Sequence, residues 1–152
     1  MPSNEIRLTT HVAATPERVW EVLTDLDGAE HTLSGVTRIE RVGGDGYRVG
    51  TRWRETRTMF GREATEEMWV AEVDAPHRTV VRARSGGTEY ATVFTLTPTG
   101  SGTDLAMTFA ADPGTSVLHR LLAATVGRLG AAVTRKVMTT DLRDIAARAE
   151  RI

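Results

Sequence analysis

The 152-residue chain has no cysteine, a single lysine (Lys136), and aromatic side chains at only 5% of its positions. Without cysteine there can be no disulfide, no thiolate metal site and no cysteine nucleophile. No apolar run approaches the roughly 20 residues that cross a bilayer, so we expect no stable membrane insertion. Acidic and basic residues are interspersed at a net charge of -1. The chain therefore lacks the basic patch that nucleic-acid binding requires.

The remaining composition is that of an ordinary globular protein, with 40% hydrophobic and 26% charged residues. We expect residues 1–152 to form one domain. The first residues are polar and lead into a predicted strand, which indicates no signal peptide and a cytoplasmic location. The four histidines are not spaced as a metal-binding pair would be, so the sequence predicts no metal and no cofactor. They are His11, His31, His77 and His119.

The order of predicted elements is one strand, a short helical stretch, a series of strands and a long helix. Apolar residues alternate from Ile6 to Val12, as in a half-buried strand. Thr15 and Pro16 predict the start of a helix that ends at Asp27-Gly28. Further elements are predicted at 29–33 (short helix), at 36–42, 51–59, 63–73, 78–85, 88–97 and 104–111 (strands), and at 116–150 (long helix). Short connections favour antiparallel neighbours. The predicted fold is α+β, a seven-stranded curved antiparallel sheet around the C-terminal helix.

Four segments carry a family resemblance, at 14–20, 49–57, 61–67 and 74–78. They resemble the polyketide cyclase/dehydrase-like bacterial branch of the SRPBCC superfamily, which includes START domains and the birch-pollen allergen. The last segment departs slightly, because the family often has a second proline where Ala75 stands. The resemblance covers nearly the entire chain and implies a helix-grip fold with a hollow between sheet and helix. It implies the type of site rather than a reaction, because this fold has many functions.

The candidate site lies on two neighbouring strands. Trp53, Glu55 and Arg57 share one face of the first strand, and Glu67 and Trp69 share one face of the second. If these side chains face the helix, they form a polar patch in an apolar hollow, as in ligand pockets. If they face solvent, they form an exposed ladder of ion pairs. Two carboxylates held close together should raise the pKa of one of them, unless Arg57 neutralises the pair.

The length of the connecting loop decides which side chains meet. A three-residue loop at 60–62 places Trp53 opposite Trp69 and Glu55 opposite Glu67. A two-residue loop at 60–61 shifts the register and places the two tryptophans on opposite faces. Both possibilities remain open from the sequence.

Further pocket candidates lie on the following strands. Val81 and Ala83 are small inward-facing residues that leave room for a ligand. Tyr90 and Thr92 carry hydroxyl groups, which need a hydrogen-bond partner when buried. The larger apolar residues nearby are predicted to be core: Phe94, Leu96, Leu105 and Phe109.

Three functions are compatible with this pattern. The favoured one is binding of a small hydrophobic or aromatic molecule, lipid- or polyketide-like, because no complete acid–base set is visible. The alternative is a cyclase or dehydratase in which Glu55 or Glu67 moves a proton and Arg57 or Tyr90 polarises a carbonyl. The third is a co-chaperone-like protein-interaction domain. A homodimer is also possible.

Overall fold

The computed structural model describes residues 5–59, 61–85, 87–112 and 117–151, with side chains except those of 59, 85, 112 and 117–130. Its elements are β1 (Glu5–Val12), α1 (Pro16–Leu23), α2 (Ala29–Thr32), β2 (Val36–Gly43), β3 (Arg52–Met59), β4 (Arg62–Asp74), β5 (Arg78–Ser85), β6 (Thr88–Thr99), β7 (Gly102–Asp112) and α3 (Val117–Ala149). The strands form one sheet in the order β1-β7-β6-β5-β4-β3-β2. Every neighbouring pair is antiparallel. The predicted helix-grip architecture is confirmed.

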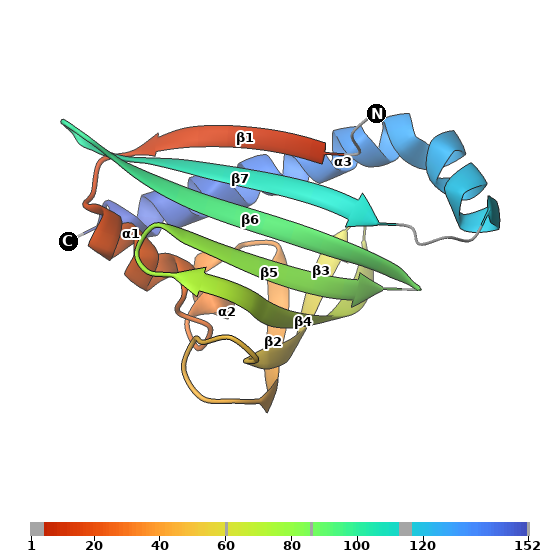
Figure 1. Cartoon of the computed structure of the whole chain (residues 1–152), viewed down its shortest axis with the longest axis horizontal. Helices are drawn as coiled ribbons and strands as arrows, with labels where there is room; N and C mark the ends of the chain where they lie inside the picture. The colour runs from red at the N-terminus through yellow and green to blue at the C-terminus, as the bar shows by residue number, and fades with distance from the viewer. Residues whose placement is uncertain (1–4, 60, 86, 113–116, 152) are drawn as a thin grey trace.

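The long helix α3 runs across one face of the curved sheet, and α1 and α2 lie beside its C-terminal part (Figure 1). The buried core joins these layers. Leu105 of β7 and Val12 of β1 are fully buried in one cluster with Val19 of α1 and Met138 and Leu142 of α3. This packing fixes the position of α3 over the sheet. In the described part of the chain, no helix is both long and apolar enough to cross a membrane.

The first helix begins where the sequence predicts and ends earlier. The Thr15 hydroxyl accepts a hydrogen bond from the Arg18 amide at 3.2 Å, and Pro16 opens the first turn. The helix ends at Leu23 rather than at Gly28. The Thr24 hydroxyl donates to the Trp20 carbonyl at 2.8 Å, and the Asp25 carboxylate accepts from the Gly28 amide at 3.1 Å. The Asp25 bond competes with helix continuation, because it takes the Gly28 amide that a longer helix would need for a backbone bond.

The β3–β4 hairpin has the shorter of the two possible loops. Met59 pairs with Arg62, so only Phe60 and Gly61 connect the strands. Gly61 has φ +74°, in the left-handed region that two-residue hairpin turns require and glycine adopts readily. The three-residue alternative is therefore wrong, and Glu55 lies opposite Glu66 instead of Glu67.

Candidate functional site

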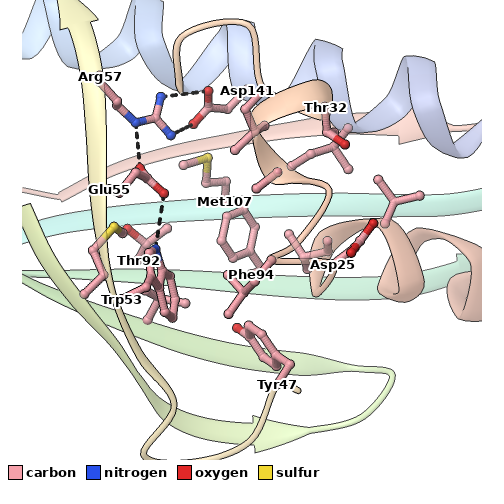
Figure 2. Close-up of a pocket in the computed structure, with 18 residues that line it drawn as sticks. Asp25, Thr32, Tyr47, Trp53, Glu55, Arg57, Thr92, Phe94, Met107 and Asp141 are labelled. Atoms are coloured by element: carbon pink, nitrogen blue, oxygen red, sulfur yellow. Dashed lines mark hydrogen bonds and ion pairs between the residues drawn. The ribbon is translucent and has the colours of Figure 1, made fainter. Parts of the chain in front are cut away.

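A cavity of about 110 Å³ lies between the sheet, α3 and the segment that holds α1 and α2. Its walls are mainly apolar, with Val22, Leu23, Leu26, Ala29, Leu33, Met68, Val81, Phe94, Met107 and Ile145. Polar groups stand at two opposite sides, Trp53, Glu55, Arg57 and Asp141 on one and Asp25 and Thr32 on the other (Figure 2). An apolar hollow with a few oriented polar groups is the usual composition of a small-molecule site.

The first polar side is a continuous hydrogen-bonded chain from β3 to α3. The Trp53 indole Nε1 donates to Glu55 Oε1 at 3.5 Å. Arg57 Nε donates to Glu55 Oε2 at 2.8 Å, and its two terminal nitrogens donate to the Asp141 oxygens at 3.1 and 2.9 Å. Figure 2 shows these side chains aligned along the cavity wall. The fork of Arg57 thus holds the helix to the sheet by a bidentate ion pair.

Two carboxylates share this one guanidinium. The side chains of Glu55 and Asp141 are only 10% and 8% exposed, and that of Arg57 is 20% exposed. Burial acts to lower the pKa of Arg57, but Asp141 and Glu55 outweigh it and raise that pKa above its ordinary value. Burial raises the pKa of Asp141, while Arg57 counteracts this rise. Arg57 therefore stays charged, and the three groups together carry one net negative charge when both acids are ionised.

Three predicted site residues face the helix, which is the first of the two orientations considered in the sequence analysis. Trp53, Glu55 and Arg57 lie on one face of β3, as the period of a strand dictates, and that face looks toward α3. Val81 of β5 and Thr92 of β6 also line the cavity. Their roles in binding remain proposals.

The positions predicted for Glu67 and Trp69 are wrong. Because the loop has two residues, both side chains lie on the outer face of the sheet. Glu67 is 46% exposed and accepts a hydrogen bond from Arg52 at 2.5 Å. The Trp69 ring lies beneath two guanidinium groups, with the carbon of Arg52 at 5.0 Å and that of Arg84 at 5.6 Å from its centroid. These cation–π contacts stabilise the outer face and do not reach the cavity.

Two further predicted residues lie beyond the described lining of this cavity. Ala83 is buried next to Tyr90 on the inner face of the sheet. The Tyr90 ring stacks on Phe109 at 5.4 Å between centroids, so Phe109 covers one face of the ring. Burial and the nearby carboxylate of Glu66 raise the pKa of Tyr90. This part of the inner face continues from the cavity toward the other end of the sheet.

Glu66 takes the place that the sequence analysis gave to Glu67. It is half-buried on β4, directly opposite Glu55. Burial raises its pKa, the charge of Glu55 raises it further, and Arg57 lowers it. The expected pair of neighbouring carboxylates with one raised pKa thus occurs one position earlier. The Phe60-Gly61 turn was the sequence signal for this register.

Two other groups of the site were missed. Asp141 lies 84 positions from Arg57 in the chain, and the sequence around Asp141 contains no signal that predicts its ion pair with Arg57. Tyr47 reaches the cavity from the loop between β2 and β3 and donates its hydroxyl hydrogen to Thr79 at 2.7 Å, since the Thr79 hydrogen goes to the Glu72 carbonyl. Burial raises the pKa of Tyr47 to about 12.

The polar group on the far side of the cavity is structural. Arg148 of α3 donates to the Asp25 carboxylate at 3.0 Å and also bonds to the Thr32 hydroxyl and to the Gly28 carbonyl. These bonds hold the α1–α2 segment against the helix. No group of three or more metal-ligating side chains is arranged to hold a metal ion within the described residues.

The fold and the cavity define a helix-grip protein with an internal small-molecule-sized hollow. The chain belongs to the family of polyketide cyclase/dehydrase and lipid transport proteins, whose model matches residues 4–150. This confirms the resemblance to the polyketide cyclase-like branch of the SRPBCC superfamily. None of the curated proteins compared with the chain matches it.

Solved structures share the fold at low sequence identity. The protein TTHA0849 from Thermus thermophilus is similar with a TM-score of 0.78 and 22% identity, over 95% of this chain and 96% of that one. The Zhui aromatase/cyclase from Streptomyces sp. R1128 has a TM-score of 0.81 and 18% identity, over 97% and 93%. The di-domain aromatase/cyclase StfQ of the steffimycin biosynthetic pathway has a TM-score of 0.77 and 17% identity, over 96% of this chain and 50% of that one. At these identities the likeness shows the fold alone.

Proposed function

We propose that this protein binds a small, uncharged, mainly apolar molecule, aromatic or lipid-like, in the cavity between sheet and α3. The observation that carries the proposal is the pairing of an apolar hollow with the buried chain Trp53–Glu55–Arg57–Asp141 at one wall. The family's description and the two aromatase/cyclases of like fold support a ligand of this type. At about 110 Å³ the cavity is somewhat smaller than the apolar cavity of about 150 Å³ that binds benzene, so it has room for no more than one aromatic ring.

The charges of the polar wall favour an uncharged ligand. Arg57 has five N–H donors, and its bonds to Glu55 and Asp141 use three of them. The remaining donors can bind a carbonyl or hydroxyl oxygen. A carboxylate on the ligand would instead add a third negative charge beside two buried acids, which repel it. Free fatty acids are therefore disfavoured relative to esters, ketones and phenols.

Native mass spectrometry of freshly purified protein tests for a co-purified ligand. Isothermal titration calorimetry with phenol and benzoate, which have similar size and differ in charge, then tests the selectivity. We expect phenol to bind and benzoate to bind at least about tenfold more weakly. Glu55→Gln should narrow this difference, while Glu67→Gln on the outer face should leave it unchanged. Absence of any bound molecule together with absence of phenol binding would overturn the proposal.

A second candidate function is proton transfer of the cyclase or dehydratase type, and Glu66 is the observation that favours it. A general acid must hold its proton near neutral pH, and burial and Glu55 raise the pKa of Glu66. Glu67, one of the two acids expected for this role, lies on the opposite face. In this role Arg57 polarises a carbonyl in the cavity. Glu66, which lies opposite Glu55 on the inner face of the sheet but outside the described lining of the cavity, returns or removes the proton.

Deuterium exchange separates catalysis from binding. In heavy water, proton NMR follows exchange of the methyl hydrogens of acetophenone, a one-ring ketone with an acidic C–H next to its carbonyl. If the protein catalyses proton transfer, exchange should exceed the buffer rate, fall in Glu66→Gln and persist in Glu67→Gln. A rate equal to buffer in the wild type leaves ligand binding as the function.

A further inference from the structure

A second hollow lies on the other side of the Arg57–Asp141 ion pair. It is a groove of about 290 Å³ between α3 and the chain around Gly35, and it is lined by Ser34, Gly35, Thr58, Val133, Lys136, Val137 and Thr140. Arg57 and Asp141 belong to the walls of both the groove and the cavity. The ion pair is therefore the shared boundary of an inner and an outer compartment.

The sizes of the two compartments raise a question about the ligand. The cavity of about 110 Å³ holds one ring, whereas ligand sites of proteins commonly measure about 300–1,000 Å³. Cavity and groove together reach the lower part of that range. A ligand longer than one ring must extend across the boundary, which requires the guanidinium and the carboxylate to separate.

We propose that the cavity and the groove are two compartments of one ligand site, and that the Arg57–Asp141 ion pair is the gate between them. The proposal rests on the proposed function and extends it. It assigns to the groove the outer part of an elongated, uncharged molecule whose first ring fills the cavity. Opening then moves Asp141 away from Arg57 and lets the ligand oxygen take its place at the guanidinium.

The contacts around Arg57 allow such an opening. Glu55 holds the guanidinium through Nε at 2.8 Å, so Arg57 keeps one buried counter-ion when Asp141 leaves. On the groove side, a Cβ added at Gly35 would lie 3.3 Å from Arg57 Nη1. The missing side chain leaves the terminal nitrogens room to move. No buried side-chain nitrogen or oxygen among the described residues lacks a hydrogen-bond partner, so every buried polar atom of the closed gate has at least one partner without a ligand.

Each compartment is lined by a residue whose environment can be followed separately. Trp53 is 3% exposed and lines the cavity. Lys136 lines the groove and is the only lysine of the chain. An amine-reactive acetylating reagent therefore has one side-chain target, and the N-terminal amine serves as an internal control. Protection of Lys136 reports occupation of the groove.

The experiment compares phenol, with one ring, with 4-phenylphenol, with two. Calorimetry measures the binding of each, and mass spectrometry measures the acetylation of Lys136 in the saturated complex. We expect both probes to bind, and 4-phenylphenol alone to slow acetylation of Lys136, by about fivefold or more. Gly35→Ala, which crowds the guanidinium on the groove side, should weaken 4-phenylphenol more than phenol.

The gate itself is tested with Asp141→Asn. This variant loses the ionic part of the closing contact, and we expect the ratio of the 4-phenylphenol affinity to the phenol affinity to rise about tenfold. Glu150→Gln is the control, because it removes the same charge just beyond the end of α3, at a carboxylate that bonds the Ala13 amide and lines neither compartment. Circular dichroism establishes that each variant is folded. If Asp141→Asn does not fold, Asp141→Glu, which keeps the charge and changes its reach, should still alter the ratio.

The outcomes distinguish the two proposals. If 4-phenylphenol binds and Lys136 remains as reactive as in the free protein, the two-compartment site is wrong and cavity binding stands. The same holds if Asp141→Asn changes the affinity ratio no more than Glu150→Gln does. If neither probe binds, the proposed function fails, and this inference fails with it.

Discussion

Replacement of Arg57 by methionine is the most informative perturbation of the polar wall. Methionine fills much of the volume of the arginine stem but removes the charge, which leaves Glu55 and Asp141 without their cation. Their side chains are 10% and 8% exposed, so solvent cannot replace the guanidinium. Removal of one partner of a buried ion pair typically lowers the free energy of unfolding by about 3–5 kcal/mol. We expect a loss in this range.

The loss should depend on pH in a defined direction. Without Arg57, burial and the charge of Glu55 raise the pKa of the Asp141 carboxyl group in the folded state above its value in the unfolded chain. A raised folded pKa contributes stability that is complete below the unfolded pKa and disappears as the pH rises through the folded value. The deficit of Arg57→Met should therefore be larger at pH 8 than at pH 5.

Urea unfolding, followed by tryptophan fluorescence and circular dichroism, measures this effect. With a slope of about 2 kcal/mol per M, a loss of 3–5 kcal/mol lowers the midpoint by about 1.5–2.5 M. Arg54→Met on the same strand is the matched control: Arg54 is 55% exposed and pairs with the 41% exposed Glu40, so its loss should cost less than about 1 kcal/mol. Adding Glu55→Gln and Asp141→Asn to Arg57→Met should restore most of the stability. A deficit equal to that of Arg54→Met, or one that does not change with pH, would refute the reasoning.

Three smaller predictions concern other parts of the chain. Glu66→Gln should raise the free energy of unfolding at pH 8, because the pKa of Glu66 is raised in the folded state and the ionised acid is unfavourable there. This gain in stability should vanish near pH 4. Urea titrations at both pH values measure the gain, and a loss of stability at pH 8 would contradict the prediction. Thr15→Ala should lower stability by about 1 kcal/mol by removing the cap of α1, whereas Thr15→Ser should not, as thermal unfolding can show. Trp69→Phe should leave phenol affinity in calorimetry at the wild-type value, because the ring lies on the outer face; a large loss would mean that the register is wrong.

Much of the fold follows from local pattern. The alternation of apolar residues from Ile6 to Val12 defines β1, and the cap at Thr15 defines the start of α1. Both signals come from residues that are close together in the chain. The strands are confirmed with ends that shift by one or two residues, as at β6 and β7. The end of α1 was misplaced because the Asp25 carboxylate binds the Gly28 amide, which a continued helix would need for its own backbone bond. Such competition depends on side-chain geometry that the apolar period does not contain.

The sequence predicts the part of the candidate site that lies on β3, but not the part that lies on β4. Strand period alone places Trp53, Glu55 and Arg57 on one face, and this holds for any register of the hairpin. It cannot say which acid of β4 stands opposite Glu55. That choice between Glu66 and Glu67 depends on a single residue in the loop, because a shift of one position turns every side chain to the other face.

The sequence by itself determined the class of fold, the shared face of the β3 triad and the mixture of apolar and charged side chains around the hollow. The tertiary structure decided that the triad faces inward, that Asp141 of α3 is the second counter-ion of Arg57, and that the pair stands between two hollows. The physical reason is the distance along the chain over which each interaction acts. Strand period and helix caps act over a few residues, whereas the Arg57–Asp141 contact exists only after the packing of α3 on the sheet has brought together side chains 84 positions apart.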